Sequence, residues 1–132
     1  MKCLTIKHKE MIYALELMDG NYYVGYTERA VETRYLEHLN DIGACWTRLH
    51  KPIRIIETRA GTKKDEDNLT IKYMMEYYWT RVRGGKWCEV EMNTPPKQLR
   101  DLYLRLHRFR EASISQPFIP SVSEIPARYK HT

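Results

Sequence analysis

The sequence predicts a single domain that mixes β-strands with α-helices. Two short runs rich in Tyr, Val, Ile and Leu flank Asp19-Gly20, which is typical of a β-hairpin over residues 11–27. A third run with β-branched residues, 53–59, is bounded by a proline and a glycine. Apolar residues recur at helical spacing between and after these runs. At 132 residues the chain is long enough for one core, and nothing divides it in two.

The loop length of the hairpin decides which side chains share a face. A two-residue loop, Asp19-Gly20, places Tyr13 and Tyr23 on opposite faces of the sheet, because strand side chains alternate. A three-residue loop over 19–21 sets Met18 opposite Tyr22 and Leu17 opposite Tyr23. With that odd loop, one face carries Tyr13, Leu15, Leu17, Tyr23 and Gly25.

Residues 28–40 follow as a predicted helix, with Thr27 as its candidate N-cap. Arg34 and His38 are four positions apart, so they project from the same side of this helix. Taken alone, the pair is explained by a solvated face with ion pairs to Glu37 or Asp41.

The middle of the chain predicts a turn with a short irregular piece at 43–52, a strand at 53–59 and a long helix. Trp46 is expected in the core or its wall. The helix has Thr62 or Asp65 as its cap and is closed by Gly84-Gly85. Glu66 in its first turn is explained by the helix dipole, which favours acidic residues there. The apolar stripe of this helix is Leu69, Tyr73, Met74 and Tyr77.

A basic amphipathic helix is predicted at 95–112, after two prolines. Its apolar stripe is Leu99, Leu102, Tyr103, Leu106 and Phe109. Its cations outnumber its acidic residues, and either a docked helix with a solvated face or a DNA contact explains them. Ser and Pro dominate from Ser113 onward, so 113–132 is predicted to be an extended or partly disordered tail. Residues 1–94 form the main domain in this division.

Composition narrows the class of protein further. Cys3, Cys45 and Cys88 are widely spaced, which argues against a disulfide framework and a zinc site. The net charge of +5 favours an anionic partner such as nucleic acid. No apolar stretch approaches the length of a membrane span, and the start of the chain has no apolar signal region. An intracellular protein, in the cytoplasm or nucleus of a host, is therefore expected, with its oligomeric state open.

The hairpin resembles the two motifs of the GIY-YIG nucleases. Met11-Ile12-Tyr13 stands where that family has Gly-Ile-Tyr, and Tyr23-Val24-Gly25 stands where it has Tyr-Ile-Gly. Arg34 and His38 match an arginine on the next helix and a histidine one turn later. Glu66 matches the glutamate of a third segment, with Asp65 and Glu76 as alternatives.

That third segment, which ends in Val82-Arg83-Gly84-Gly85, is most similar to small GIY-YIG proteins of large DNA viruses and phages. The resemblance covers about residues 11–86. Arg81 departs from it, because many relatives have asparagine there. The cation either binds a phosphate or marks a weakened enzyme.

The resemblance implies an α+β domain in which helices flank a three-stranded antiparallel sheet. It also implies a metal-dependent DNA endonuclease. Tyr13 would be the general base, His38 its proton acceptor and Tyr23 a supporting hydrogen-bond donor. Arg34 would hold the phosphate. Glu66 would be the sole carboxylate on Mg²⁺ (or Mn²⁺), an ion that often needs only one or two.

Three separate basic groups are expected to supply the DNA contacts, provided that at least two reach the rim of the Tyr13 cleft. The candidates are Arg48, Lys51, Arg81, Arg83, Lys86, Arg105 and Arg108. Two other hypotheses stay open. One is an inactive GIY-YIG scaffold that binds nucleic acid without cutting it. The other is an accessory protein that grips a partner protein through its C-terminal helix, with salt-insensitive association as its mark.

Overall fold

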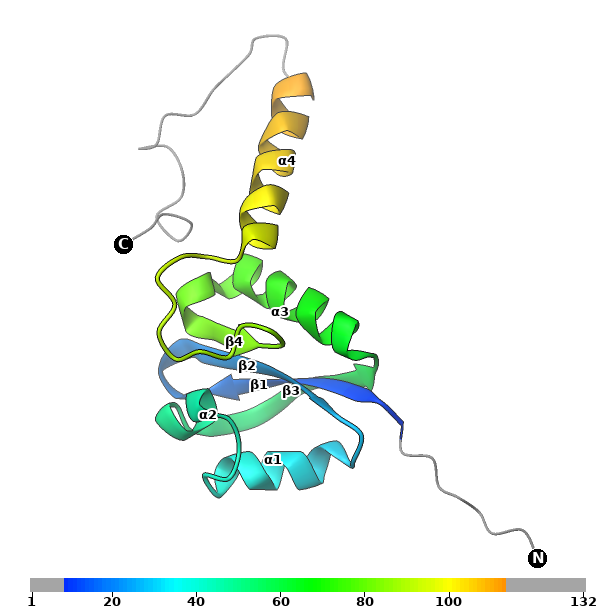
Figure 1. The fold of residues 1–132 in the computed structure, drawn as a ribbon, viewed down its shortest axis with the longest axis vertical. Helices are drawn as coiled ribbons and strands as arrows, with labels where there is room; N and C mark the ends of the chain where they lie inside the picture. Colours follow the sequence, from blue (N-terminus) through cyan, green and yellow to red (C-terminus); the bar gives the residue numbers. More distant parts are fainter. Residues whose placement is uncertain (1–8, 114–132) are drawn as a thin grey trace, which may run out of the picture.

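A four-stranded mixed sheet forms the centre of the fold in this computed structural model, which describes residues 9–113 (Figure 1). Its strands are β1 (Met11–Leu17), β2 (Asn21–Thr27), β3 (Pro52–Ala60) and β4 (Val82–Gly84), in the order β3-β1-β2-β4. The strand β1 is antiparallel to both β2 and β3, whereas β4 is parallel to β2. The predicted α+β class is confirmed, but the predicted three-stranded antiparallel sheet is wrong. A strand of three residues is too short to leave a periodic signal.

The hairpin has the odd loop that the sequence predicted, at a different place. Leu15 pairs with Tyr23 and Tyr13 with Gly25, so the loop is Met18–Gly20 and not 19–21. The side-chain amide of Asn21 donates to the Met18 carbonyl at 2.9 Å, which closes the turn and lets β2 begin at Asn21. The pairing shifts by two residues, an even number, so both tyrosines still share a face.

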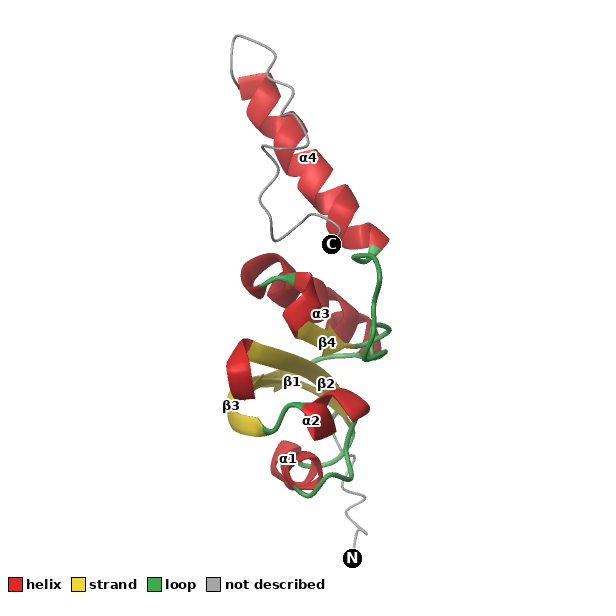
Figure 2. Ribbon diagram, turned by 90° about the vertical axis from the view of Figure 1, so that its left-hand side faces the viewer, coloured by secondary structure: helices red, strands yellow, loops and turns green. Residues whose placement is uncertain are grey.

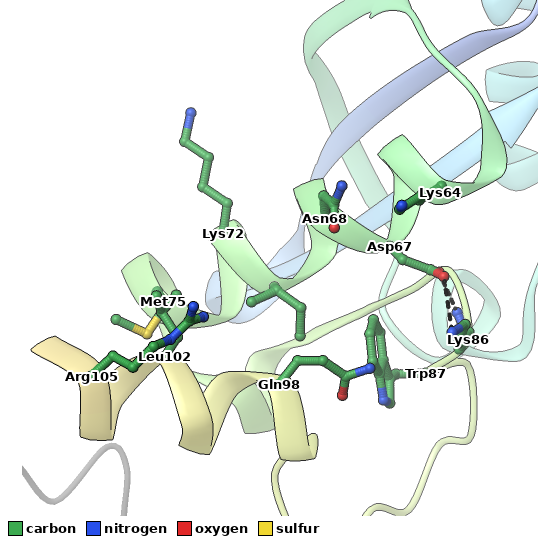
Figure 3. A pocket seen from close by; sticks show the side chains of 11 residues that line it. Lys64, Asp67, Asn68, Lys72, Met75, Lys86, Trp87, Gln98, Leu102 and Arg105 are labelled. Carbon is green, nitrogen blue, oxygen red and sulfur yellow. Dashed lines mark hydrogen bonds and ion pairs between the residues drawn. The ribbon is translucent and has the colours of Figure 1, made fainter.

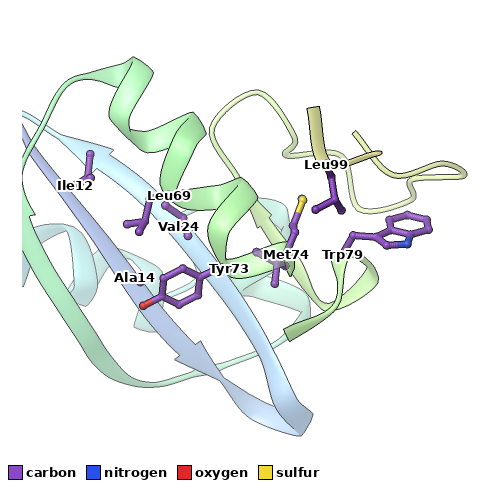
Figure 4. Packing of buried hydrophobic residues seen from close by; sticks show 9 residues of the cluster. Ile12, Ala14, Val24, Leu69, Tyr73, Met74, Trp79 and Leu99 are labelled. Atoms are coloured by element: carbon purple, nitrogen blue, oxygen red, sulfur yellow. The ribbon is translucent and has the colours of Figure 1, made fainter. Parts of the chain in front are cut away.

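Helices cover both faces of the sheet (Figures 1 and 2). On one face lie α1 (Val31–Leu39) and α2 (Cys45–Leu49), and on the other lies α3 (Lys63–Tyr77). Each face has its own core. Beneath α3, residues from the sheet and the helices pack together (Figure 4): Ile12, Ala14, Val24, Leu69, Tyr73, Met74, Trp79 and Leu99. Beneath α1 and α2 lie Tyr13, Leu15, Leu17, Tyr23, Val31 and Trp46, which confirms the predicted core position of Trp46.

Two helix termini differ from the prediction. Thr27 does not cap α1, because its hydroxyl accepts from the Arg29 backbone at 3.0 Å and the helix begins only at Val31. The long helix ends at Tyr77 and not at the glycine pair, since Tyr78 has a φ of 91° and leaves the helix. A short 3-10 turn, η2 (Trp79–Arg81), then leads into β4.

The start of α3 uses both predicted cap residues together. The Thr62 hydroxyl accepts from the Asp65 backbone, and the Asp65 carboxylate accepts from the Thr62 backbone at 2.8 Å. This capping box fixes the first turn of α3, which carries Glu66.

The predicted C-terminal helix forms as α4 (Lys97–Ser113), which projects beyond α3 (Figures 1 and 2). Leu99 is buried at 1% exposure, but Leu106 is 48% exposed, so the predicted apolar stripe is only partly covered. Side chains are described for residues 9–106, so the predictions for the side chains of Arg108 and Phe109 lie outside the described part, as does the predicted tail after Ser113. Within the described part of the chain, none of the helices has the length and apolar character that a bilayer crossing requires.

Candidate active site

The face of the sheet beneath α1 brings Tyr13, Tyr23 and His38 together. The Tyr13 hydroxyl lies 2.9 Å from His38 Nε2. The two tyrosine rings are 6.4 Å apart between centroids, and the Tyr23 ring lies 5.0 Å from the imidazole. Tyr13 comes from β1, Tyr23 from β2 and His38 from α1, so the hairpin pairing and one helix turn define the group.

The hydrogen bonds of Thr47 set the direction of the Tyr13–His38 bond. The Thr47 hydroxyl donates its single proton to the Ala44 carbonyl at 2.9 Å, and its oxygen lies 2.8 Å from His38 Nδ1. It must therefore accept from Nδ1–H, which leaves Nε2 without a proton in neutral imidazole. Nε2 then accepts from the Tyr13 hydroxyl. Thr47 and His38 are both fully buried, so water does not compete for these bonds.

Two glycines make room for this chain of hydrogen bonds. A β-carbon at Gly25 would overlap the phenol of Tyr13, and one at Gly43 would overlap the ring of His38. The glycine of the second sequence motif is thus explained by space, because the tyrosine ring lies directly over it.

Burial dominates the protonation of the group. It raises the pKa of Tyr13 well above the usual range, with Tyr23 adding to the rise and Arg34 opposing it. Burial likewise raises the pKa of Tyr23 to about 12. Burial, aided by Arg34, lowers the pKa of His38 from 6.5 to about 4. At neutral pH both phenols are therefore protonated and the imidazole is neutral.

The low pKa of His38 predicts a loss of stability in acid. The unfolded chain binds a proton at His38 below pH 6.5 and the folded one only near pH 4, so folding stability falls as the pH drops through this interval. A shift of this size corresponds to about 3 kcal/mol, most of which is lost between pH 7 and pH 4.5. Urea unfolding at pH 7 and pH 4.5 should show the loss in the wild type, and a smaller loss in His38→Gln. Equal losses in both proteins would contradict this prediction.

Arg34 lies on the same helix as His38 and is the accessible cation of the group. Its Nη1 donates to Glu37 at 2.9 Å, and Arg29 contacts the same carboxylate at 2.6 Å. The Arg34 side chain is 26% exposed, compared with 1% for the residue Tyr13. It also interacts electrostatically with both tyrosines. Part of the Arg34 side chain is therefore open to solvent.

Glu66 reaches this group from the opposite layer. The pairing of β4 with β2 ends at Gly84, opposite Val24. Glu66, in the first turn of α3, interacts electrostatically with Tyr13 and Tyr23. Asp65, one of the alternatives, is used in the capping box, and Glu76 lies near the far end of the helix.

The positive charge near the Glu66 carboxylate does not offset the effect of its burial. Burial and the neighbouring Asp67 raise its pKa to about 7, although the Gly85 backbone and Lys63 oppose the rise. No three acidic, His or Cys side chains gather into a metal cluster among the described residues. A half-buried carboxylate is an oxygen ligand of the kind that Mg²⁺ accepts while it keeps most of its waters. Glu66 is therefore a candidate ligand for a hard divalent cation.

The predicted nucleic-acid contacts fall into different surroundings. Arg83 is 3% exposed and donates to the carbonyls of Trp79, Val82, Glu89 and Val90, with its guanidinium 4.4 Å from the Trp46 ring centroid. Burial lowers its pKa to about 10, so it stays charged at neutral pH. This burial argues against the predicted nucleic-acid contact at Arg83, which has no surface to offer.

The other predicted cations whose side chains the structure describes are on the surface. Arg81 donates to the Asp19 carbonyl at 3.0 Å, across the hairpin loop. Lys51 pairs with Asp41, and Arg48 donates to the Cys45 sulfur at 2.9 Å. Lys86 and Arg105 line one groove between α3 and α4, so the fold joins two of the three predicted basic groups.

Sequence reasoning missed Thr47 and Gly43 as members of the site. Both follow His38 through a turn, and no spacing rule links a threonine to a histidine nine residues earlier. It also missed Lys64 and Lys72, two further groove residues. Their spacing was informative, since positions 64, 68 and 72 lie on one helix face.

Comparisons with known proteins agree with this geometry. A sequence model described as the GIY-YIG catalytic domain matches residues 9–85, more than half of the chain. A UPF0213 protein of Streptococcus pneumoniae strain R6 is 37% identical over 59 residues, which are 45% of this chain and 59% of that protein. A UPF0213 protein of Halalkalibacterium halodurans is 40% identical over 55 residues, 42% of this chain and 57% of that protein.

The match thus spans less than two thirds of these relatives. A UPF0213 protein of the archaeal Halobacterium salinarum is 38% identical over 55 residues, 42% of this chain and 70% of that protein. No solved structure matches the chain significantly. The paired tyrosines on one sheet face, the arginine and histidine on the next helix and the family match lead to one conclusion: the chain belongs to the GIY-YIG family.

Proposed function

We propose that this protein is a metal-dependent DNA endonuclease that hydrolyses phosphodiester bonds. One observation carries the proposal: the Tyr13 hydroxyl donates to the unprotonated Nε2 of His38 within a group that includes Tyr23, Arg34 and Glu66. A phosphodiester needs a deprotonated water, charge stabilisation and help for the leaving oxygen. Each of these needs has a candidate side chain here.

Tyr13 acts as the general base through a relay. Its raised pKa means that it holds its proton at neutral pH, so it cannot act as a standing phenolate. As the Tyr13 oxygen takes a proton from the attacking water, its own proton passes to His38 Nε2, and the phenol is left neutral. A bound phosphate places negative charge nearby and raises the pKa of His38, which favours the transfer.

Arg34 and Tyr23 hold the phosphate. The partly exposed Arg34 side chain carries N–H donors in a planar fork, which suits phosphate oxygens better than an ammonium does. With its pKa raised to about 12, Tyr23 remains a neutral hydroxyl that can donate to the phosphate or to the attacking water.

Glu66 would hold the divalent ion, Mg²⁺ or Mn²⁺. When bound, the ion supplies Lewis-acid stabilisation of the phosphate and of the leaving oxygen. The protein side contributes a half-buried carboxylate whose charged form a cation would favour.

A plasmid nicking assay tests the proposal. The wild type should convert supercoiled plasmid to the nicked or linear form with Mg²⁺, and not in EDTA. Tyr13→Phe, purified in parallel, should give no product and so excludes a contaminating nuclease. A wild type that binds DNA without cutting it under any divalent ion would instead support the inactive-scaffold hypothesis. The contact between Arg81 and Asp19 counts against that alternative, because it gives Arg81 a role in the hairpin and not in the tyrosine group.

Thr47 should affect the rate by fixing the tautomer of His38. Thr47→Val leaves the Nδ1–H of His38 without an acceptor. The imidazole can then adopt the other tautomer, with its proton on Nε2, and Nε2 can no longer accept the proton of Tyr13. We expect cutting to fall about 10- to 100-fold, a part of what positioned proton transfer contributes. Thr47→Ser keeps the hydroxyl and should restore most of the rate. If Thr47 had a structural role alone, Thr47→Val and Thr47→Ser would cut at equal Mg²⁺-dependent rates once both are shown to be folded.

A further inference from the structure

A groove between α3 and α4 lies outside the tyrosine group (Figure 3). Its volume is about 640 Å³. Lys86 and Trp87 lie at one end, and Met75, Leu102 and Arg105 at the other. On α4, the lining residues Gln98, Leu102 and Arg105 recur at helical spacing, so one side of this helix forms a wall.

The groove combines a cationic rim with an apolar floor. Four cations line it, Lys64, Lys72, Lys86 and Arg105, and among the residues that the structure describes the only acidic lining residue is Asp67, which pairs with Lys86 at 3.7 Å. The floor is formed by Ile71, Met75, Trp87 and Leu102. The surplus of positive charge suits an anionic ligand, and the apolar floor suits apolar groups on the same ligand. A chain with regularly spaced negative charges and apolar groups between them has both.

One turn joins the groove to the catalytic carboxylate. The Gly85 backbone hydrogen-bonds to Glu66, and the next backbone N–H, that of Lys86, donates to Asp67 at 3.0 Å. Paired bonds between Gly84 and Trp87, at 2.8 and 2.9 Å, close the turn. Glu66 and Asp67 are adjacent on α3, and the turn that they contact carries Trp87. A nucleic-acid strand that leaves the site beside Glu66 therefore has only a short way to go to reach Trp87.

We propose that this groove binds an unpaired nucleic-acid strand next to the cut site, with a base stacked on Trp87 and phosphates at Lys72 and Arg105. In duplex DNA the base faces are stacked on one another, so they cannot contact the apolar floor of the groove. A single strand exposes both its bases and its phosphates, and grooves that bind it combine cations with an aromatic platform. The inference rests on the proposed function, and it names the substrate class: nucleic acid with a single-stranded segment flanking the scissile bond.

Binding measured without cutting tests the groove separately from the chemistry. A short fluorescein-labelled oligothymidylate is titrated in EDTA and followed by anisotropy. Trp87→Ala should weaken binding about 5- to 100-fold, the effect expected for one stacked base. Lys72→Glu with Arg105→Glu should make the salt dependence shallower by about 1.4, or 0.7 for each of two contacts. The control is Lys9→Glu with Arg59→Glu, which changes the net charge equally at exposed positions outside the groove.

The outcomes separate this inference from the proposed function. An unchanged oligothymidylate affinity in Trp87→Ala, or an equal loss in the control pair, overturns the groove as a strand site and leaves it to another occupant. Mg²⁺-dependent plasmid cutting in that case still supports the endonuclease. A Trp87-dependent affinity in a wild type that never cuts supports the groove and contradicts the endonuclease.

Discussion

Replacing Glu66 with glutamine is expected to abolish Mg²⁺-dependent cutting while leaving DNA affinity unchanged or slightly higher. Glutamine keeps the size of the side chain but supplies no negative charge for a divalent ion. Losing several kcal/mol of charge stabilisation corresponds to roughly a 1,000-fold or greater loss of rate. Binding should not suffer, because a half-buried acidic group beside an anionic substrate is removed.

Asp65→Asn is the matched control, since it removes a carboxylate from the same helix turn. Asp65 is engaged with Thr62 in the cap, so this variant should lose some stability and keep its cutting activity. Nicking rates with and without EDTA, together with anisotropy on the same DNA, separate chemistry from binding. Cutting that survives Glu66→Gln would show that another group carries the metal.

Gly25→Ala is expected to cause the second large effect, although glycine and alanine differ by one methyl group. The new β-carbon would overlap the Tyr13 phenol, so the ring has to move away from His38. We expect cutting to fall about 100-fold or more, since the proposed general base is displaced, and stability to fall by about 1 to 3 kcal/mol from overpacking.

A double-mutant cycle identifies the ring as the cause. In a Tyr13→Leu background the phenol is gone, and Gly25→Ala should cost much less stability there than in the wild type. Gly61→Ala is the milder control, because the nearest atoms to its β-carbon would be side-chain atoms of Asp65 and Ile12 at about 3.1 Å, which need to move by only a few tenths of an ångström. Equal costs for Gly25→Ala in both backgrounds would show that the backbone, and not Tyr13, requires the glycine.

The hairpin and its shared face could be predicted from the sequence because strand geometry has a period of two. Any odd loop puts Tyr13 and Tyr23 together, so an error in the loop position did not disturb their common face. Arg34 and His38 were found through the family resemblance, and their four-residue spacing alone predicted a common helix face. These features depend on short-range pattern, which a single sequence records.

The remaining features depend on contacts between distant segments. Strand β4 reads as the end of a helix until its pairing with β2 is known. Thr47 has no local mark of its bond to His38. Arg83 looks like every other surface cation in the sequence, yet the fold buries it against Trp46. In each case the partner, and not the residue's own neighbourhood, decides its role.

Arg83 also has a consequence for how this chain can vary. Its guanidinium holds the segment that leads toward α4 by donating hydrogen bonds to the backbone carbonyls of Glu89 and Val90. Every residue type has a backbone carbonyl, so this path can be kept while the side chains along it are exchanged. We expect sequence drift to be fast at the exposed positions of this connector and slow at Arg83, and also at Val90 and Met92, because these two side chains pack against the cores. Natural or engineered versions of the protein could therefore exchange the exposed side chains of this connector and still deliver α4 to the same place.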